Sequence, residues 1–219
     1  MDRSEAAAIF IAEAHAARKP YANIPDHIAP RTLAEAYAAQ EALARVWSPR
    51  LGPVAGLKIA TTTKVMQALM GIDHPCGGMI YASRIHASPA TIDKAHYVNV
   101  RIECELAVRL GRDLTPHGAP WTRETVQAAI SEVMAAYELI EDRNAVYKET
   151  HAVSLIADNA WNAGIVLGPE AKVAPGLDLN GINCRLAIDG KPAKEGKTDD
   201  PMGALAWVVN LAADRERPL

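Results

Sequence analysis

Two glutamates stand two positions apart in an alternating stretch that runs from Arg101 to Val108. If this stretch is a strand, Glu103 and Glu105 point to one face, and the apolar residues between and around them anchor the other face in the core. Two neighbouring carboxylates repel each other, and an isolated pair of this kind is most often a solvated strand face. Another glutamate in a similar setting and a lysine in a second strand-like segment favour a different interpretation, a site for a divalent metal ion.

The third carboxylate of such a site would come from the run Met134 to Asp142, which is compatible with either a helix or a strand. As a strand, this run places Glu138 and Glu141 on opposite faces, and the residues alone leave the choice between them open. Three carboxylates with open coordination positions suit Mg²⁺ or Mn²⁺, hard cations that keep water and accept substrate oxygens. The sequence offers no histidine pair or cysteine cluster for a zinc site.

Lys58 lies in the apolar segment Val54 to Ala60, which we expect to be a short strand. A lysine in such a place either reaches solvent from a strand end, which is the commoner case, or is held against carboxylates. Beside a metal-bound 2-oxo acid, the lysine would neutralise a carboxylate or move a proton. The sequence has no GxSxG elbow, P-loop or GxGxxG motif, so serine-nucleophile, phosphate-loop and dinucleotide chemistry have little support.

The composition is that of an ordinary globular protein. The 219 residues are 49% hydrophobic and 22% charged, which is enough for one domain with a sizeable core. With a net charge of -3 and no apolar run of transmembrane length, neither nucleic acid nor a membrane is an expected partner. Three cysteines without a CxxC motif, and an N-terminus without a signal-peptide pattern, predict buried thiols and a cytoplasmic location.

Helical signals come first along the chain, and strand signals dominate afterwards. The expected helices cover residues 4–17, 32–47, 64–70, 123–133 and 201–213, and the expected strands cover 54–60, 97–110, 162–168 and a hairpin around Asp189-Gly190. This order predicts an α+β fold with a mostly β core rather than a regular βαβ alternation. We expect a helical N-terminal region, residues 1–53, and a metal-binding catalytic β-rich domain, residues 54–219, that forms one structural unit.

Several motifs are spread between Thr32 and Leu219. They are Gly56-Leu57-Lys58-Ile59 with Thr62, Lys64 and Gly71-Ile72-Asp73; Glu103-Cys104-Glu105; Tyr137 to Arg143; Ala157-Asp158-Asn159-Ala160 with Gly164 and Gly168; and Pro201 to Asn210 with Ala206-Trp207. In this combination the sequence resembles the 2-keto-4-pentenoate hydratases of the fumarylacetoacetate hydrolase superfamily. The combination is specific, whereas the Glu-x-Glu pair alone would not be.

The resemblance implies N-terminal helices on a mixed, β-barrel-like core and a site for Mg²⁺ or Mn²⁺. It implies Glu103, Glu105 and Glu138 as the metal ligands, which favours Glu138 over Glu141. It further implies catalytic roles for Lys58 and Glu105, and the implied substrate-binding residues are Thr62, Asp73, Asp158 and Asn159. The implied activity is the addition of water to a 2-hydroxydienoate of the 2-oxopent-4-enoate type. The product is a 4-hydroxy-2-oxo acid of aromatic meta-cleavage catabolism, and the implied enzyme is a homo-oligomer that acts on a small 2-oxo acid.

Three other functions stay open. The same metal-dependent chemistry would serve a 2-oxo acid decarboxylase. An acylpyruvate-type hydrolase usually needs a His–carboxylate pair, for which His15 with Glu13 and His27 with Asp26 are weak candidates. Members of the resembled family usually continue through further strands after the late helix. Because these strands are apparently missing from a sequence that ends at Leu219, a shortened, non-catalytic partner subunit is the third alternative.

Overall fold

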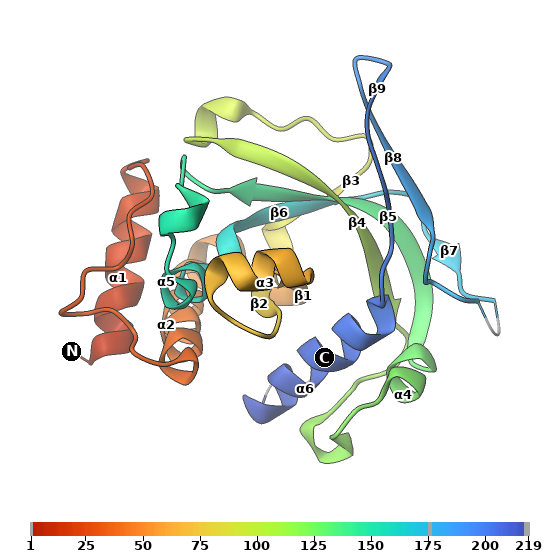
Figure 1. Cartoon of the computed structure of the whole chain (residues 1–219), viewed down its shortest axis with the longest axis horizontal. Coiled ribbons are helices and arrows are strands. Elements are labelled where there is room, and N and C mark those ends of the chain that lie inside the picture. The colour runs from red at the N-terminus through yellow and green to blue at the C-terminus, as the bar shows by residue number, and fades with distance from the viewer. Residues whose placement is uncertain (1, 175–176, 217–219) are drawn as a thin grey trace. The chain divides into compact units, whose positions relative to one another are not determined.

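The computed structural model describes residues 2–174 and 177–216 (Figure 1). They form two compact units. The first comprises the described residues up to Glu103 together with Glu138–Val166, and the second comprises Cys104–Tyr137 and the described residues from Leu167 onward.

The first unit begins with two helices that pack against each other, α1 (Arg3–Ala16) and α2 (Leu33–Leu51) (Figure 1). The Thr32 hydroxyl caps α2 by accepting a hydrogen bond from the Glu35 N–H at 3.1 Å. Small alanines and Leu43 line the contact, which allows the two helices to approach closely. The helix α2 continues past the predicted end at residue 47 and stops at Gly52, whose φ of 82° suits glycine.

Strand β1 (Val54–Ala60) pairs antiparallel with β2 (Cys76–Tyr81), and helix α3 (Lys64–Met70) connects them. Lys58 stands opposite Gly78 in this pairing. A Cβ at Gly78 would lie 2.8 Å from the Asn159 carbonyl oxygen and 3.0 Å from Lys58 Cδ. The glycine therefore leaves room for the lysine stem to cross the sheet. The predicted bounds of β1 and α3 are both confirmed.

A larger sheet has the strand order β3-β6-β5-β4, and β7 pairs with β5. Its members are β3 (Ile85–Ala87), β4 (Val100–Leu110), β5 (Ile130–Glu141), β6 (Asn162–Leu167) and β7 (Ala171–Lys172). The run left open between helix and strand is therefore a strand. The predicted helix over residues 123–133 is wrong beyond Gln127, because β5 already begins at Ile130.

The α+β class with N-terminal helices is confirmed, while the pairings among the described residues establish no closed barrel. The expectation that strands beyond the late helix are missing concerns positions outside the described residues and stays a prediction. The remaining short helices are α5 (Ala152–Ala157) and the 3-10 turns Ala82–Arg84, Lys94–His96, Pro116–Gly118, Tyr147–Glu149 and Asn159–Trp161.

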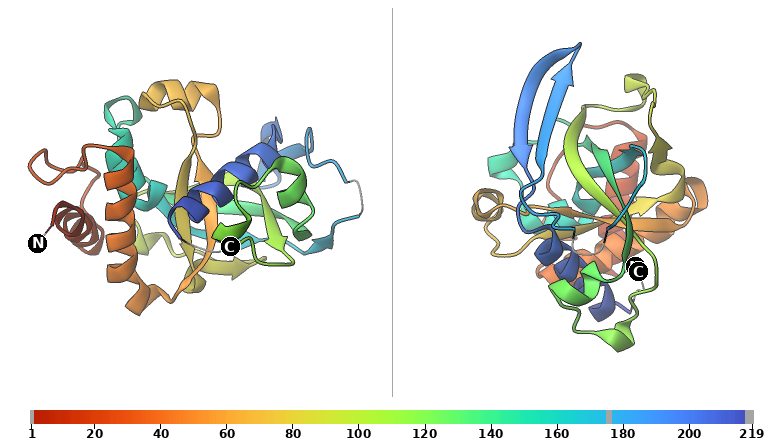
Figure 2. Two further views of the ribbon diagram at one scale, coloured as in Figure 1. Left: turned by 90° about the horizontal axis from the view of Figure 1, so that it is seen from below. Right: turned by 90° about the vertical axis from the view of Figure 1, so that its right-hand side faces the viewer.

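The second unit holds the predicted hairpin and late helix. The hairpin consists of β8 (Asn183–Ile188) and β9 (Lys191–Lys197), and α6 (Pro201–Asp214) follows it (Figure 2). Asp200 caps α6 by accepting from the Gly203 N–H at 3.1 Å. Asn210 fastens α6 to the segment before α4 (Arg123–Gln127) through two hydrogen bonds with the Trp121 backbone.

Among the described residues, no helix combines the length and the apolar character needed to span a bilayer. All three cysteines are free thiols. Only Cys76 is buried, whereas Cys104 and Cys184 are partly exposed, so the prediction of buried thiols holds for one of the three.

Candidate metal centre

Strand β4 carries the first two carboxylates of the predicted site. Glu103 and Glu105 are exposed, whereas Glu138 from β5 is 3% exposed. Ligand atoms of the three carboxylates lie within 4.8 Å of one another. Oxygen ligands at about 2.1 Å from a Mg²⁺ ion stand roughly 3 to 4 Å apart, so this cluster needs only small side-chain movements to surround one cation.

The other face of β4 differs from the prediction. Ile102 is 47% exposed, and Cys104 and Leu106 are only partly buried. The expected anchoring of this face in the core is therefore wrong. A strand face is buried only where another element packs over it, and alternation within the strand does not report that.

Lys58 is held against the buried carboxylate. Its Nζ lies 2.8 Å from Glu138 Oε1 and 3.2 Å from the Ala160 carbonyl oxygen, and the residue is 8% exposed. Of the two interpretations that the sequence left open, the structure therefore supports the lysine paired with a carboxylate. A buried charge of either sign is tolerated only with such a partner, because desolvation costs several kcal/mol per ion.

Asn162, at the start of β6, also holds Glu138. Its Nδ2 donates to Glu138 Oε1 at 3.0 Å, and the residue is 9% exposed. Both Lys58 and Asn162 act on Oε1, and none of the described residues donates to Oε2. The carboxylate is thus oriented with one oxygen fixed by the protein and the other left for a cation, as outer-shell partners of metal ligands commonly arrange it. Sequence reasoning missed Asn162, which belongs to no ligand pattern.

Glu141, the rival candidate, serves a different purpose. Its carboxylate accepts hydrogen bonds from the backbone N–H groups of Val98 and Asn99, each at 3.0 Å, and of Arg143 at 3.2 Å. These bonds fix the segment that leads into β4. The Glu141 side chain is thereby occupied, and Glu138 as the third ligand stays a prediction.

Asp142 is the fully buried centre of a second cluster beside Glu141. Arg101 Nε lies 2.6 Å from its carboxylate, and Asn99 Nδ2 donates to it at 2.7 Å. The Tyr147 hydroxyl donates to the same carboxylate at 3.3 Å. Burial, and then the negative charge of Asp142, raise the pKa of Tyr147 to about 12, so this tyrosine stays neutral at physiological pH.

The four predicted substrate-binding residues lie in two settings. Thr62 and Asp73 are exposed at the two ends of α3. Asn159 is 1% exposed, and its amide group bonds to both backbone groups of Met79, at 2.6 and 2.8 Å. Asp158 is 2% exposed and is bound by His15 and Arg143. Their roles toward a substrate stay predictions.

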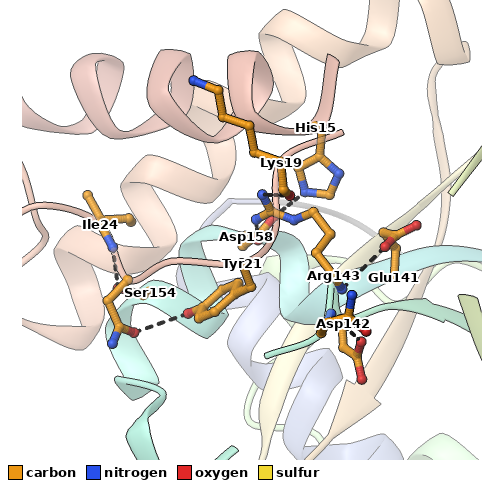
Figure 3. Close-up of polar contacts among 11 residues, drawn as sticks. His15, Lys19, Tyr21, Ile24, Glu141, Asp142, Arg143, Ser154 and Asp158 are labelled. Atoms are coloured by element: carbon orange, nitrogen blue, oxygen red, sulfur yellow. Dashed lines mark hydrogen bonds and ion pairs between the residues drawn. The ribbon is translucent and has the colours of Figure 1, made fainter. Parts of the chain in front are cut away.

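The contacts of Asp158 also bear on the candidate His–carboxylate pairs (Figure 3). His15 Nε2 lies 2.7 Å from Asp158 Oδ1, so the carboxylate partner of His15 is Asp158 and not Glu13. Arg143 Nη2 donates to the other oxygen at 2.5 Å. The partners His15 and Asp158 are 143 residues apart in sequence, which is why neighbouring residues gave no signal for this pair.

The carboxylate cluster fits a divalent cation. Three acidic side chains converge, and Lys58 is the cation that the structure pairs with one of them. A hard cation with oxygen ligands would offset the repulsion between the carboxylates. All the donors are carboxylate oxygens, and the protein orients Glu138 through its Oε1. Such a donor set matches Mg²⁺ or Mn²⁺ better than Zn²⁺.

Residues 73–216 match the family described as fumarylacetoacetate (FAA) hydrolase C-terminal, which is more than half of the chain, and the chain belongs to this family. It is 27% identical over 221 residues to 2-keto-4-pentenoate hydratase 2 of Dechloromonas aromatica (strain RCB), covering 98% of this chain and 82% of that protein. It is 30% identical over 191 residues to 2-oxo-hept-4-ene-1,7-dioate hydratase of Escherichia coli, covering 83% and 71%.

A solved structure shares the fold. It is 4-oxalocrotonate decarboxylase from Pseudomonas putida G7, in complex with magnesium and adipate. The TM-score is 0.88 at 24% sequence identity, and the match covers 99% of this chain and 82% of that one. The expected fumarylacetoacetate-hydrolase-type fold and the resemblance on which it rested are both confirmed.

Proposed function

We propose that this chain is a divalent-metal-dependent hydratase of a 2-hydroxydienoate of the 2-oxopent-4-enoate type. The observation that carries the proposal is the cluster of Glu103, Glu105 and Glu138, with the Lys58 ammonium 2.8 Å from the buried member. The names of the two hydratase relatives support the same reaction class. Hydration adds H and OH across a carbon–carbon double bond to give a 4-hydroxy-2-oxo acid, and it needs no oxidant or reductant.

The residues of the chain have distinct tasks in this proposal. Glu103, Glu105 and Glu138 would hold Mg²⁺ or Mn²⁺, which when bound polarises the carboxylate and keto oxygens of a 2-oxo acid. Lys58, whose Nζ lies 2.8 Å from Glu138 Oε1, would transfer a proton to or from the substrate. Asn162 keeps Glu138 in its ligand orientation. Thr62, Asp73, Asp158 and Asn159 remain proposed substrate-binding residues.

The experiment that tests this function supplies 2-hydroxypenta-2,4-dienoate with Mg²⁺ or Mn²⁺ and follows the loss of dienol absorbance. We expect the product, identified by NMR, to be 4-hydroxy-2-oxopentanoate. Lys58→Met should lower turnover about a hundredfold, the usual size of a lost proton-transfer group, while Mn²⁺ affinity changes by a smaller factor. Lys191→Met, at an exposed position of β9, is the matched control and should behave as wild type. Unchanged turnover in Lys58→Met would remove this lysine from the mechanism.

Decarboxylation of a 2-oxo acid is the second candidate, because a decarboxylase shares this fold at a TM-score of 0.88. The two reactions differ in product, so 4-oxalocrotonate is supplied in parallel and release of CO₂ is measured. An acylpyruvate-type hydrolase would instead cleave a carbon–carbon bond with water. A folded protein that binds Mn²⁺ but turns over none of these substrates would favour the non-catalytic partner subunit.

We also propose that the protein works as a homo-oligomer in the cytoplasm. The three free cysteines agree with a reducing compartment. Light scattering of the purified chain measures the oligomer directly, and a mass of 23.5 kDa in solution would contradict it. The division into a helical region, 1–53, and a catalytic region, 54–219, is part of the same proposal.

A further inference from the structure

The first unit contains a cavity of about 120 Å³ whose lining is strongly basic. Its charged and titratable groups include four arginines and two histidines, and Glu141 is the carboxylate among them. The basic residues are Arg18, Arg50, Arg84, Arg143, His15 and His96. They come from α1 and the residues just after it, the end of α2, the turn after β2, the segment before β4 and the residues after β5.

The charges of this cavity are not balanced by the residues that line it. Glu141 is occupied by three backbone N–H groups, as described above. Arg18 donates to the Ala95 carbonyl oxygen, and Arg84 donates to the Tyr97 hydroxyl at 3.2 Å, so both bind neutral oxygens. Within residues 2–174 and 177–216, neither of them nor Arg50 has a carboxylate within ion-pair distance. Such a surplus of positive charge around one cavity attracts an anion.

Arg143 adds a second, independent observation. Its side chain is 3% exposed and is held rigidly by Asp158 and by stacking over the Tyr21 ring, at 5.5 Å from Cζ to the ring centroid (Figure 3). Its Nε is buried and has no hydrogen-bond partner in the described part of the chain. A buried donor on a charged group is costly when it is left unpaired. Arg143 lines the cavity, so its positive charge would lie beside an anion bound there.

The size and donor type define the ligand. A volume of about 120 Å³ is large enough for a small anion. Arginines present planar pairs of donors that match carboxylate and phosphate oxygens. Lys58 and the carboxylate cluster do not line the cavity. The position is therefore separate from the proposed metal centre, although Asn162 lines the cavity and also donates to Glu138.

We infer that this cavity is a binding site for a small oxyanion of the carboxylate or phosphate type, distinct from the metal centre. The inference does not depend on the proposed reaction.

Isothermal titration in the presence of EDTA tests the inference, with inorganic phosphate and succinate as separate probes at constant ionic strength in chloride. We expect one anion to bind per chain without metal. Arg50→Gln and Arg84→Gln, which replace arginines less buried than Arg143, should each weaken binding about tenfold, the usual effect of losing one charged hydrogen bond. The matched control is Arg31→Gln, an exposed arginine of the same unit outside the cavity, and it should bind as wild type.

Binding of phosphate alone, of succinate alone or of both supports the site and identifies its ligand chemistry. Three results would overturn it. They are the absence of binding for both anions, equal binding by Arg84→Gln and Arg31→Gln, and binding that requires Mg²⁺ and disappears in Glu105→Gln. The last result would assign the anion to the metal centre instead. Thermal unfolding of each variant confirms that the comparison is made between folded proteins.

Discussion

Replacing Lys58 with methionine should destabilise the metal-free protein strongly and the metal-bound protein less. The side chains of Lys58 and Glu138 are 7% and 3% exposed, and their charged atoms are 2.8 Å apart. Methionine keeps the apolar stem but leaves Glu138 buried without its cation. Breaking a buried pair in this way typically costs about 3 to 5 kcal/mol of unfolding free energy.

A bound divalent cation changes this cost, because it compensates the same carboxylate. The loss measured in saturating Mg²⁺ should therefore be smaller than the loss in EDTA by at least about 1 kcal/mol, which corresponds to a severalfold tighter metal affinity in the variant. Removing both charges, in Lys58→Met combined with Glu138→Gln, should cost less than the sum of the single changes by about 1 to 3 kcal/mol.

The assay is urea denaturation followed by tryptophan fluorescence, since Trp47 and Trp161 are both buried in the unit that contains Lys58. Lys191→Met serves as the control for a lost surface charge and should shift the midpoint little. Equal losses for Lys58→Met in EDTA and in Mg²⁺, or a loss below about 1 kcal/mol in EDTA, would refute the idea that this ion pair and a metal share Glu138.

Three further predictions follow from other contacts. Asn162→Ala should weaken Mn²⁺ binding by about 10- to 100-fold in calorimetry, because Glu138 loses an orienting donor; unchanged affinity would show that Asn162 is dispensable. Burial raises the pKa of the Cys76 thiol, so at pH 8 it should react slowly with a disulfide reagent, and Cys76→Ser should leave the count of fast thiols unchanged. Hydrogen bonding from Arg123 lowers the pKa of Asp200 below its value of about 3.8 in the unfolded chain. The ionised Asp200 therefore stabilises the folded protein at pH values above 3.8, and this contribution is lost as the pH falls through the lower pKa of the folded state. Arg123→Gln should raise the pKa of Asp200 in an NMR titration, and an unshifted titration would argue against this pair.

The local pattern predicted the elements that carry the candidate site. Period-two alternation around Glu103 and Glu105 identified β4, and the apolar run around Lys58 identified β1 with its observed bounds. Patterns of this kind report which face a residue occupies, so they are informative wherever one element dominates the local sequence.

Prediction failed where one segment satisfies two patterns. Val126, Ala129 and Ile130 have helical spacing, yet the helix ends at Gln127 and Ile130 already belongs to β5. Tertiary pairing in the sheet overrides the local helical preference there. The prediction that Ile102 is buried was also wrong. Alternation shows which residues share a strand face, but it does not show whether another element covers that face.

Contacts between residues far apart in the sequence could not be predicted from the sequence either. Nothing local joins His15 to Asp158, or Asn162 to Glu138, because each pair is created by the packing of separate elements. The choice of Glu138 over Glu141 came from the resemblance, and the contacts of the two side chains now provide a physical reason for it.

Metal-dependent turnover of 2-hydroxypenta-2,4-dienoate by the wild-type chain and by Glu105→Gln tests the central claim most directly. The protein is first stripped with EDTA, and Mg²⁺ or Mn²⁺ is then restored. Glu195→Gln, at an exposed position of β9, provides a matched loss of one carboxylate outside the cluster. We expect the metal to restore hydration in wild type and in Glu195→Gln but not in Glu105→Gln. Hydration that persists in EDTA, or full activity of Glu105→Gln, would contradict it.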